Sequence, residues 1–388
     1  MTHLYDEIGV TRVINASGSM TYLGGSLIAP EVLEKMREAA GAFVVMEELM
    51  DWAGQEIAAL TGAEAGMVTS GSAGGILLGC AACLTGADRG RMRALPHVEG
   101  KNEFVMQKQH RIGFDHAVGV AGGRIVEVGR AEATTAADIE AAIGENTAGV
   151  LYVVLDPQPT VGLEEVAEIA HGRGVPVIVD AAAEVPPVDN LNAFVRAGGD
   201  LVIFSGGKDI AGPNDSGILC GREDLIAAAR AQAFPNGPLG RPLKVSKEQI
   251  VGLVFALKRC VGLDEGVRMA RWQQMAEGQR ADGPSCRQVG RHADQGQAQA
   301  GRACARGRHD TWRASAALLA ARVPPHAAQG GWGGAEDRAA ARQGGYGVGG
   351  GCSSGVPELA VGTMGGAGAH DPWATAKHAS GVRRALTL

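Results

Sequence analysis

Short apolar runs alternate with helical patterns through most of this 388-residue chain, and this alternation constrains the fold more than any other feature. Seven such runs predict strands: Gly66–Thr69, Glu103–Met106, Arg124–Val128, Val150–Val154, Val175–Val179, Leu201–Phe204 and Ser216–Cys220. Apolar residues spaced near 3.6 predict helices between them, among them Pro30–Ala40, Leu163–Gly172, Asn190–Ala197 and Ser246–Gly262. Strands that alternate with helices favour an α/β fold with a mostly parallel sheet covered on both faces.

Residues 276–388 differ in composition from the rest of the chain. They contain no Ile, Phe or Asn, and one Lys against twelve Arg. The missing residues have AT-rich codons, whereas the abundant Gly, Ala and Arg have GC-rich ones. We therefore hypothesise that a GC-rich gene is read out of frame from about Gly278. A genuine Gly- and Arg-rich disordered tail is the alternative.

This break in composition predicts three parts of the chain. Residues 1–245 are expected to form a large domain with an N-terminal segment, 246–278 a helical connector, and 279–388 an aberrant low-complexity tail. We expect no small C-terminal domain in the tail, because it has little apolar surface to offset the backbone entropy lost on folding. At most, Thr311–Val323 is expected to form a marginal helix.

Charge, hydropathy and cysteine content exclude several classes of protein. Residues 1–275 carry 23 basic and 34 acidic residues, which argues against a nucleic-acid-binding surface. The start of the chain shows no secretory signal, and the longest apolar stretch is too short to span a bilayer, so we expect a cytoplasmic protein without a membrane partner. Of the seven cysteines, Cys80 and Cys83 form a C-x-x-C within an apolar run, with no second pair. We expect both to pack inside a helix, with no disulfide framework and no metal site.

Gly71, Ser72 and Ala73 follow the first predicted strand and open an apolar helix. Small residues let backbone N–H groups approach an anion, and the N-terminus of a helix adds positive potential. The segment does not match G-x-G-x-x-G, so a dinucleotide site is not supported. A phosphate site and a tight structural turn are both compatible with this pattern.

Asp180 and Lys208 follow two later strands. A carboxylate that ends an apolar strand costs free energy to bury unless a cation meets it, and Asp180 taken alone fits a metal ligand, a helix cap or a cofactor partner. An amine at the floor of an apolar pocket is desolvated, which favours the neutral nucleophile and Schiff-base chemistry at Lys208. An exposed strand-end lysine is the alternative. Asp209 stands where a nucleotide-binding P-loop requires Ser or Thr, which argues against nucleotide hydrolysis.

Together, an anion-binding helix N-terminus, a buried aspartate and a strand-end lysine are what pyridoxal phosphate requires. Their order and spacing resemble those of fold-type I pyridoxal-phosphate enzymes. Four segments make the resemblance specific to the selenocysteine synthase-like and D-glucosaminate-6-phosphate ammonia-lyase-like group: Arg12–Gly18, Gln109–His116, Asp156–Thr160 and Phe204–Lys208. The resemblance covers residues 8–275 and stops where the composition changes.

The resemblance implies a role for each matching residue. Lys208 would be the Schiff-base lysine and proton shuttle, and Asp180 the partner of the pyridinium nitrogen. The residues expected to bind the phosphate are Gly71, Ser72, Ala73 and Ser205. His110 would stack on the cofactor ring, with a purely structural histidine as the alternative.

Two further matches and one departure accompany these roles. Arg111 and Gln158 are candidates for contact with the substrate or cofactor. Gly212-Pro213-Asn214 stands where relatives often have Gly-Pro-Gln, which is expected to alter a local hydrogen bond and not the chemistry.

The resemblance implies a pyridoxal-phosphate lyase or transferase acting on an amino acid or amino sugar acid. Lys208 would remove the α-proton, and β-elimination would follow; racemisation, retro-aldol cleavage and transamination share the first steps. One alternative is selenium transfer to seryl-tRNA, which the acidic charge and the early start of the motifs disfavour. The other is an inactive, cofactor-binding product of a disrupted gene. Because fold-type I sites usually form between subunits, a homodimer or higher homo-oligomer is also implied.

Overall fold

The computed structural model describes residues 3–14, 18–155, 159–237, 239–281 and 321–322. Gln158 and nearly all of the expected tail, 279–388, lie outside the described residues. Two residues of that tail, Ala321–Arg322 (β9), pair antiparallel with Val13–Ile14 (β1).

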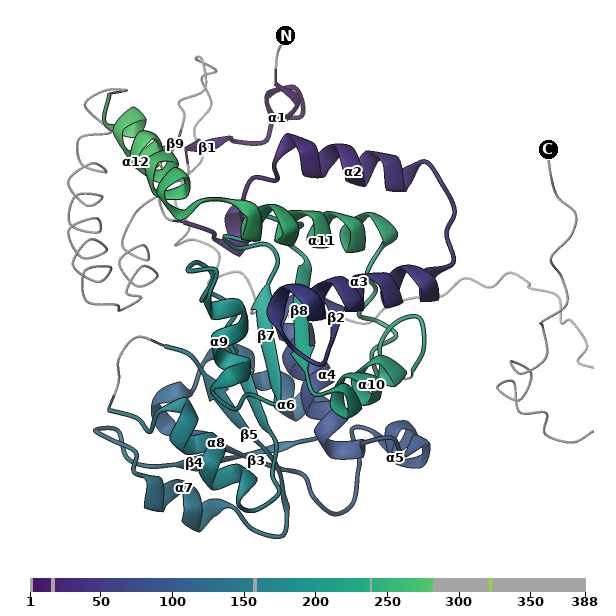
Figure 1. Cartoon of the computed structure of the whole chain (residues 1–388), viewed down its shortest axis with the longest axis vertical. Coiled ribbons are helices and arrows are strands. Elements are labelled where there is room, and N and C mark those ends of the chain that lie inside the picture. Colours follow the sequence, from purple (N-terminus) through teal and green to yellow (C-terminus); the bar gives the residue numbers. More distant parts are fainter. Residues whose placement is uncertain (1–2, 15–17, 156–158, 238, 282–320, 323–388) are drawn as a thin grey trace, which may run out of the picture. The chain divides into compact units, whose positions relative to one another are not determined.

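A seven-stranded sheet forms the centre of the fold, in the order β2-β8-β7-β6-β5-β3-β4 (Figure 1). Its strands are β2 (Ala65–Ser70), β3 (Glu103–Gln107), β4 (Arg124–Val128), β5 (Thr147–Val153), β6 (Val177–Asp180), β7 (Leu201–Ser205) and β8 (Ser216–Gly221). All seven sequence predictions are confirmed, with ends that shift by at most three residues. The sheet is mostly parallel, as expected, but β8 runs antiparallel to both of its neighbours. The connection between β7 and β8 spans only residues 206–215, which is too short for the crossover that a parallel pair needs.

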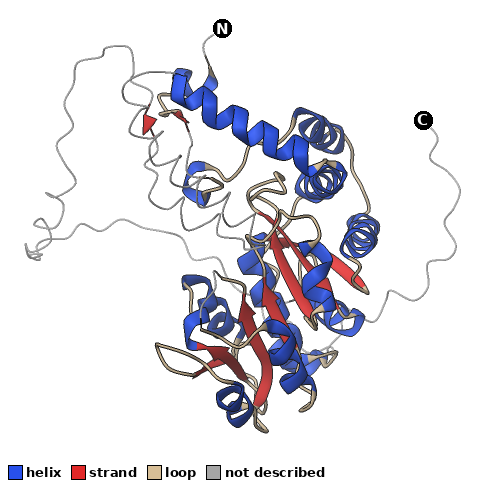
Figure 2. Ribbon diagram, turned by 60° about the vertical axis from the view of Figure 1, so that its left-hand side comes forward, coloured by secondary structure: helices blue, strands red, loops and turns tan. Residues whose placement is uncertain are grey.

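Helices cover both faces of this sheet (Figure 2). The apolar cluster on one face contains residues of α3 (Met46–Thr61), α7 (Ala136–Ala142), α8 (Leu163–His171), α9 (Asn190–Arg196) and α11 (Lys247–Gly262). The cluster on the other contains residues of α4 (Gly71–Thr85), α6 (His116–Ala121) and α10 (Glu223–Gln232). Successive strand residues alternate between the two clusters: Val177 and Val179 belong to the first, and Ile178 to the second. Burial on both faces explains why the strands are continuously apolar in sequence.

The remaining elements are short, apart from α2 and α12. They are α1 (Leu4–Glu7), η1 (Thr21–Leu23), α2 (Pro30–Ala40), α5 (Arg89–Ala94), η2 (Lys108–His110), η3 (Gly113–Asp115) and α12 (Glu265–Ala281). The four helices predicted from apolar spacing are confirmed. At the start of α11, the Ser246 hydroxyl accepts from the Gln249 N–H, and the Ser246 N–H donates to the Gln249 side chain, which forms a capping box.

The expected packing of Cys80 and Cys83 inside a helix is confirmed. Cys80 and Cys83 both lie in α4, where burial raises the pKa of each thiol, that of Cys83 to about 12. A thiol that stays protonated is a poor nucleophile and metal ligand. Among the described residues, no group of His, Cys, Asp and Glu side chains is placed to hold a metal ion, and no helix is long and apolar enough to cross a membrane.

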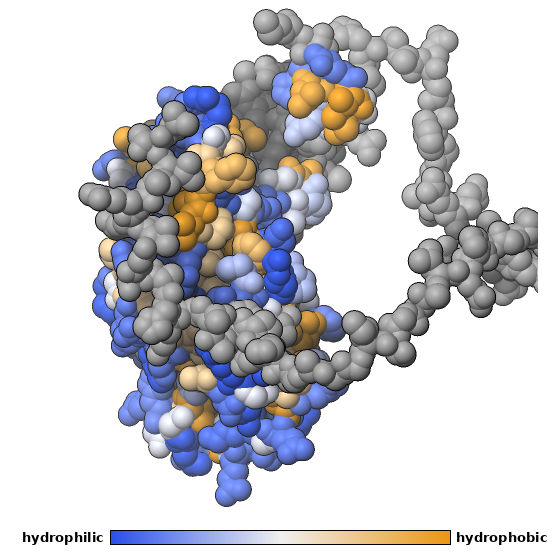
Figure 3. All heavy atoms as spheres, turned by 90° about the vertical axis from the view of Figure 1, so that its right-hand side faces the viewer, coloured by the Kyte–Doolittle hydropathy of each residue, from blue (hydrophilic) through white to orange (hydrophobic). Residues whose placement is uncertain are grey.

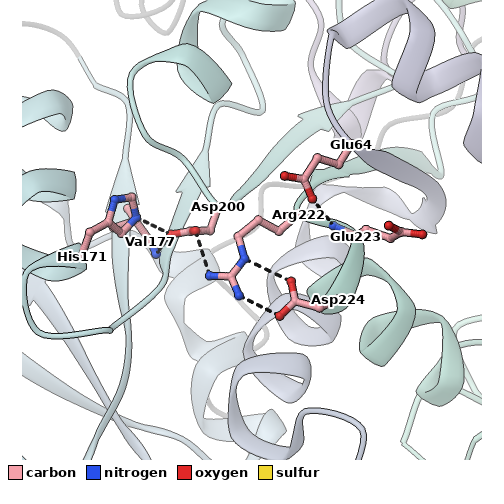
Figure 4. A network of polar contacts seen from close by, with 7 residues as sticks. All are labelled: Glu64, His171, Val177, Asp200, Arg222, Glu223 and Asp224. Carbon is pink, nitrogen blue, oxygen red and sulfur yellow. Dashed lines mark hydrogen bonds and ion pairs between the residues drawn. The ribbon is translucent and has the colours of Figure 1, made fainter.

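The amino ends of the parallel strands are joined by a network of polar contacts around Asp200 (Figure 4). One carboxylate oxygen of Asp200 accepts from the Val177 N–H and contacts Nε2 of His171, both at 2.7 Å. The other accepts from Arg222 at 3.1 Å, and Arg222 also pairs with Asp224 at 2.7 Å. Because Asp200 is only 7% exposed, each of these contacts helps to offset the loss of its hydration.

We predict that Asp200→Asn lowers the free energy of unfolding by about 2 kcal/mol, because the buried carboxylate then no longer pairs with Arg222. Denaturant unfolding followed by circular dichroism measures the change. Asp224→Asn is the matched control: Asp224 pairs with the same arginine but is 63% exposed, so its loss should cost less than about 1 kcal/mol. Equal effects of the two variants would contradict this account of the network.

Candidate active site

All described residues that the sequence singled out for cofactor chemistry lie at the carboxyl edge of the sheet. Gly71, Ser72 and Ala73 follow β2, His110 follows β3, and Asp180 ends β6. Ser205 ends β7, and Lys208 follows three residues later. Because these strands are mutually parallel, their carboxyl ends share one edge, which is where open α/β sheets bind ligands.

Asp180 and Lys208 are close enough to interact electrostatically at this edge. Asp180 is 5% exposed, and its carboxylate accepts from the Ala182 N–H at 3.1 Å. Burial raises the pKa of Asp180, while that N–H and Lys208 act against the increase. Burial lowers the pKa of the Lys208 amine, and the carboxylates of Asp180, Glu184 and Asp209 act against that decrease. Both groups are therefore largely withdrawn from water, and each favours the charged form of the other against the effect of burial.

The loop that carries Lys208 is held by its own backbone and by the strands around it. The Ala211 N–H donates to the Lys208 carbonyl at 2.9 Å, and the Gly212 N–H donates to the Gly206 carbonyl at 2.8 Å. Ala211 has a positive φ of 59°, which is uncommon for a residue with a Cβ. The Gly206 N–H in turn donates to the Ser216 carbonyl, at the start of β8. These bonds define the path of the backbone that presents Lys208.

The first turn of α4 begins directly at the end of β2. Gly71 adopts a left-handed φ of 67°, which lets the chain turn from strand to helix without a steric penalty from a Cβ. The Thr69 hydroxyl donates to the Gly71 carbonyl at 2.8 Å and stabilises this turn. The Ser70 side chain makes no capping bond within the described part of the chain. The N–H groups of this turn are thus available to an anion.

Ser205 lies in the same row of the sheet as the turn into α4. Strand pairing places Ser205 opposite Gly217 of β8, and Gly217 opposite Thr69 of β2. Ser205 comes two residues after Ile203 in β7, so the two side chains point to the same face of the sheet. The Ile203 side chain belongs to the apolar cluster on the α4 side. The half-buried Ser205 hydroxyl and the α4 N-terminus are therefore on the same side of the sheet.

His110 is buried behind this edge. The Val153 N–H points to its Nδ1 at 3.5 Å, and the Tyr152 ring packs edge-on at 4.5 Å. Val153 pairs with Asp180 in the sheet, so His110 lies next to the strand position beside Asp180. Burial lowers the pKa of His110 to about 4, so the ring is neutral at pH 7. A neutral imidazole that accepts at Nδ1 carries its hydrogen on Nε2.

Arg111 is engaged by carboxylates of its own chain. Its Nε contacts Asp115 at 2.6 Å, and Nη1 contacts Glu127 at 2.9 Å. Arg111 was expected to contact the substrate or cofactor, but its guanidinium is engaged by these two ion pairs. Its partner candidate, Gln158, is outside the described residues.

Sequence reasoning missed two charged groups near Lys208 and a third that influences one of them. Glu184 and Asp209 each raise the pKa of the Lys208 amine, and Arg268 of α12 interacts with Asp209. Asp209 is adjacent to Lys208 in sequence, and this adjacency could have indicated that the two side chains influence each other. Arg268 is 59 residues further along the chain, and nothing in its local sequence indicates this neighbour.

Comparison with known protein families shows to which family the chain belongs. A family model described as L-seryl-tRNA selenium transferase matches residues 13–271, so the chain belongs to this family. The match ends a few residues before the composition changes at residue 276.

Several members of known activity are similar to this chain. D-glucosaminate-6-phosphate ammonia lyase of Salmonella typhimurium is 38% identical over 71% of this chain and 74% of its own length. A solved structure of D-glucosaminate-6-phosphate ammonia-lyase has a TM-score of 0.66, 37% identity, and coverage of 72% of this chain and 76% of that one. L-seryl-tRNA(Sec) selenium transferase of Moorella thermoacetica is 29% identical over 68% of this chain, which spans 59% of that relative.

The residues at the carboxyl edge fit the chemical groups of pyridoxal phosphate. The turn into α4 offers N–H groups for a phosphate, and Asp180 offers a carboxylate for a pyridine nitrogen. Lys208 offers a desolvated amine for an aldehyde. The resemblance found in the sequence is thus matched by the donor set in the structure.

We predict that His110 makes stability depend on pH below about 6.5. The unfolded histidine binds a proton near its ordinary pKa, whereas the folded one resists protonation down to about 4, so stability falls as pH decreases between these values. The difference amounts to about 3 kcal/mol. His110→Asn, which keeps an acceptor but does not titrate, should lose correspondingly less stability between pH 7 and pH 4 in denaturant unfolding. The exposed control His116→Asn should follow the wild-type curve.

Proposed function

We propose that this protein is a pyridoxal-phosphate-dependent lyase that releases ammonia from an amino acid or amino sugar acid. The observation that carries the proposal is the desolvated Lys208–Asp180 pair, at the same sheet edge as the N-terminus of α4. The 38% identity to D-glucosaminate-6-phosphate ammonia lyase supports a sugar acid that bears a phosphate as the substrate.

Each residue at the edge has a defined task in this proposal. When bound, pyridoxal phosphate supplies a conjugated ring that accepts the electron pair left by the departing α-proton. Lys208 would hold the cofactor through its amine and would take the α-proton of the substrate, because desolvation favours the neutral form of that amine. Asp180 holds a proton at the ring nitrogen. Gly71, Ser72, Ala73 and Ser205 bind the phosphate through N–H and O–H groups, and the neutral His110 packs beside the ring.

Selenium transfer to seryl-tRNA is the second candidate, because the matching family model bears that description. The identity to such a transferase is 29%, against 38% to the ammonia lyase. The excess of acidic residues in 1–275 opposes the binding of a polyanion. Both observations favour the lyase.

A homodimer is part of the proposal. Ten large apolar side chains that are strongly exposed lie in the first 45 residues: Leu4, Tyr5, Ile8, Val10, Tyr22, Leu27, Leu33, Phe43, Val44 and Val45. Figure 3 shows apolar areas that interrupt the polar surface of one face. Exposed apolar area of this kind is typical of surfaces that a second subunit covers.

The out-of-frame hypothesis bears on the activity of this chain. The family match and the ordinary composition both stop near residue 275. We propose that residues from about 279 onward are not the native continuation and that the substrate pocket is incomplete. Resequencing the gene around codon 278 tests this directly.

We predict that borohydride reduction in the presence of pyridoxal phosphate labels Lys208, because its desolvated amine is the strongest nucleophile at the edge. Peptide mapping by mass spectrometry locates the label. Lys208→Ala should lose the label and, once the reading frame after codon 278 is restored, should lower ammonia release from D-glucosaminate 6-phosphate by about a thousandfold or more. Lys35→Ala, a surface control on α2, should retain both. Labelling of another lysine in the wild type would exclude the assignment.

We predict that Asp180→Asn still takes up the cofactor but, in the chain with its reading frame restored, lowers turnover by about a hundredfold, since a neutral amide does not stabilise a protonated ring nitrogen. Steady-state kinetics and the bound-cofactor spectrum separate these two effects. Asp189→Asn, an exposed aspartate on the same connection, serves as the control and should be silent. Turnover of Asp180→Asn at the wild-type rate would rule out the role.

A further inference from the structure

The N-terminal segment forms a closed turn at Met20–Gly25. The N–H groups of Leu23 and Gly25 both donate to the Met20 carbonyl at 2.9 Å. Gly24 and Gly25 adopt left-handed φ angles of 91° and 76°, which a residue with a Cβ rarely adopts. Two consecutive residues of this kind, and two hydrogen bonds to one carbonyl, give the turn a defined shape.

Gly25 lies directly against the peptide that precedes Lys208. A Cβ on Gly25 would lie 2.8 Å from the Gly207 carbonyl oxygen, and also 2.8 Å from Cγ of Asn214. Side chains do not pack this closely, so the turn approaches the loop only because residue 25 is glycine. The Asn214 side chain is exposed and can rotate away from an added methyl group. The Gly207 carbonyl belongs to the backbone of the loop, so it would move together with Lys208.

The loop that carries Lys208 is also in close contact with α11. A Cβ on Gly206 would lie 2.5 Å from Cδ1 of Leu253. A Cβ on Gly212 would lie 3.3 Å from Cβ of Ala256. Both of these α11 side chains are almost completely buried. Because a close-packed interior transmits strain, pressure from the turn would displace the Lys208 backbone rather than be absorbed.

The turn is anchored on the same helix as the loop. It is followed closely in the chain by α2, whose Glu31 pairs with Arg259 of α11 at 2.5 Å. A Cβ on Gly252 of α11 would lie 2.8 Å from Sδ of Met36 on α2. Since α2 is thus fixed on α11, the turn and the Lys208 loop share one support.

We propose that Gly25 is a positioning residue: through its contact with Gly207, the N-terminal turn sets the position of the Lys208 backbone, and with it the place where the amine meets the cofactor. This inference rests on the proposed function. The reaction of an amine with an aldehyde depends steeply on the placement of the two groups, and a displacement of about 1 Å can cost about a hundredfold in rate. A methyl group between the turn and the loop would cause part of such a displacement.

The test measures how fast the full-length chain, freed of cofactor, captures added pyridoxal phosphate at neutral pH. In capture, the Lys208 nitrogen bonds the aldehyde carbon, and the carbonyl oxygen leaves as water with the two amine hydrogens. Borohydride then delivers hydride to the same carbon, the nitrogen takes a proton from water, and the adduct is fixed. Label on the Lys208 peptide is followed against time by mass spectrometry. Thermal unfolding of each variant reports any general loss of structure.

Gly25→Ala should slow capture about tenfold, because its methyl group displaces the peptide between Gly207 and Lys208. Gly24→Ala is the matched control. Gly24 has a left-handed φ as well, but a Cβ there would meet no atom of the described chain within 4 Å. Gly24→Ala therefore introduces the same kind of backbone strain without the collision, and it should capture the cofactor at the wild-type rate.

Gly122→Ala separates positioning from a general loss of stability. Gly122 has a left-handed φ of 100°, and a Cβ there would lie 2.8 Å from the carbonyl carbon of Pro96. The strain and the collision are of the same kind as at Gly25, but Gly122 precedes β4, at the amino edge of the sheet. Gly122→Ala should lower the melting temperature and leave capture unchanged. A merely structural role of Gly25 would give the two variants the same rate of capture.

Asn214→Ala keeps the inference testable if Gly25→Ala does not fold. It removes the loop side chain that Gly25 contacts, which loosens the loop against the turn, so capture should slow about threefold. The double variant of Gly25→Ala and Asn214→Ala should be no slower than Gly25→Ala, because the contact is already lost in the single variant.

Wild-type capture in folded Gly25→Ala would overturn the inference, as would an equal loss in Gly24→Ala or Gly122→Ala. If Gly25→Ala does not fold, wild-type capture in Asn214→Ala would overturn it. A double variant whose loss is the product of the two single losses would also contradict it. Absence of label on Lys208 in the wild-type chain would instead refute the proposed function.

Discussion

The rest of this structure depends on one constraint: Lys208 and Asp180 are both largely buried, close to each other. Burial works against the charged form of both Asp180 and Lys208, and their mutual attraction works against that effect. Such a pair persists only where both faces of the sheet are covered. Here α4 covers one face beside the pair, and α11 packs on the other against the Lys208 loop.

The buried carboxylates at the two edges of the sheet differ in the number of their hydrogen-bond partners. At the amino edge, Asp200 accepts from Val177 and Arg222 and contacts His171, so its hydrogen-bonding capacity is largely used. At the carboxyl edge, Asp180 accepts the Ala182 N–H and faces the Lys208 charge. A carboxylate with many partners stabilises the fold, whereas one with remaining capacity can engage a ligand. Under the proposed function, the amino edge stabilises the fold and the carboxyl edge binds the cofactor.

Much of the fold could be predicted because burial on both faces leaves a strong mark on the sequence. Strands such as Val177–Asp180 are continuously apolar, and the helices between them keep a 3.6-residue spacing. The antiparallel direction of β8 was not predicted, since periodicity does not encode strand direction. The site residues lie at the ends of strands. The expectation that these strands are parallel was enough to predict that the residues share one edge of the sheet.

The sequence by itself determined the class of fold, the identity of the chemical groups and the point near residue 275 where the family pattern ends. These depend on residue type and short spacing, which a single chain displays directly. Only the tertiary structure decided that Glu184 lies near enough to Lys208 to affect its pKa, and that Asp115 and Glu127 pair with Arg111. Such partners are brought together by the packing of elements far apart in the chain, and electrostatic attraction depends on distance in space and burial rather than on separation in sequence.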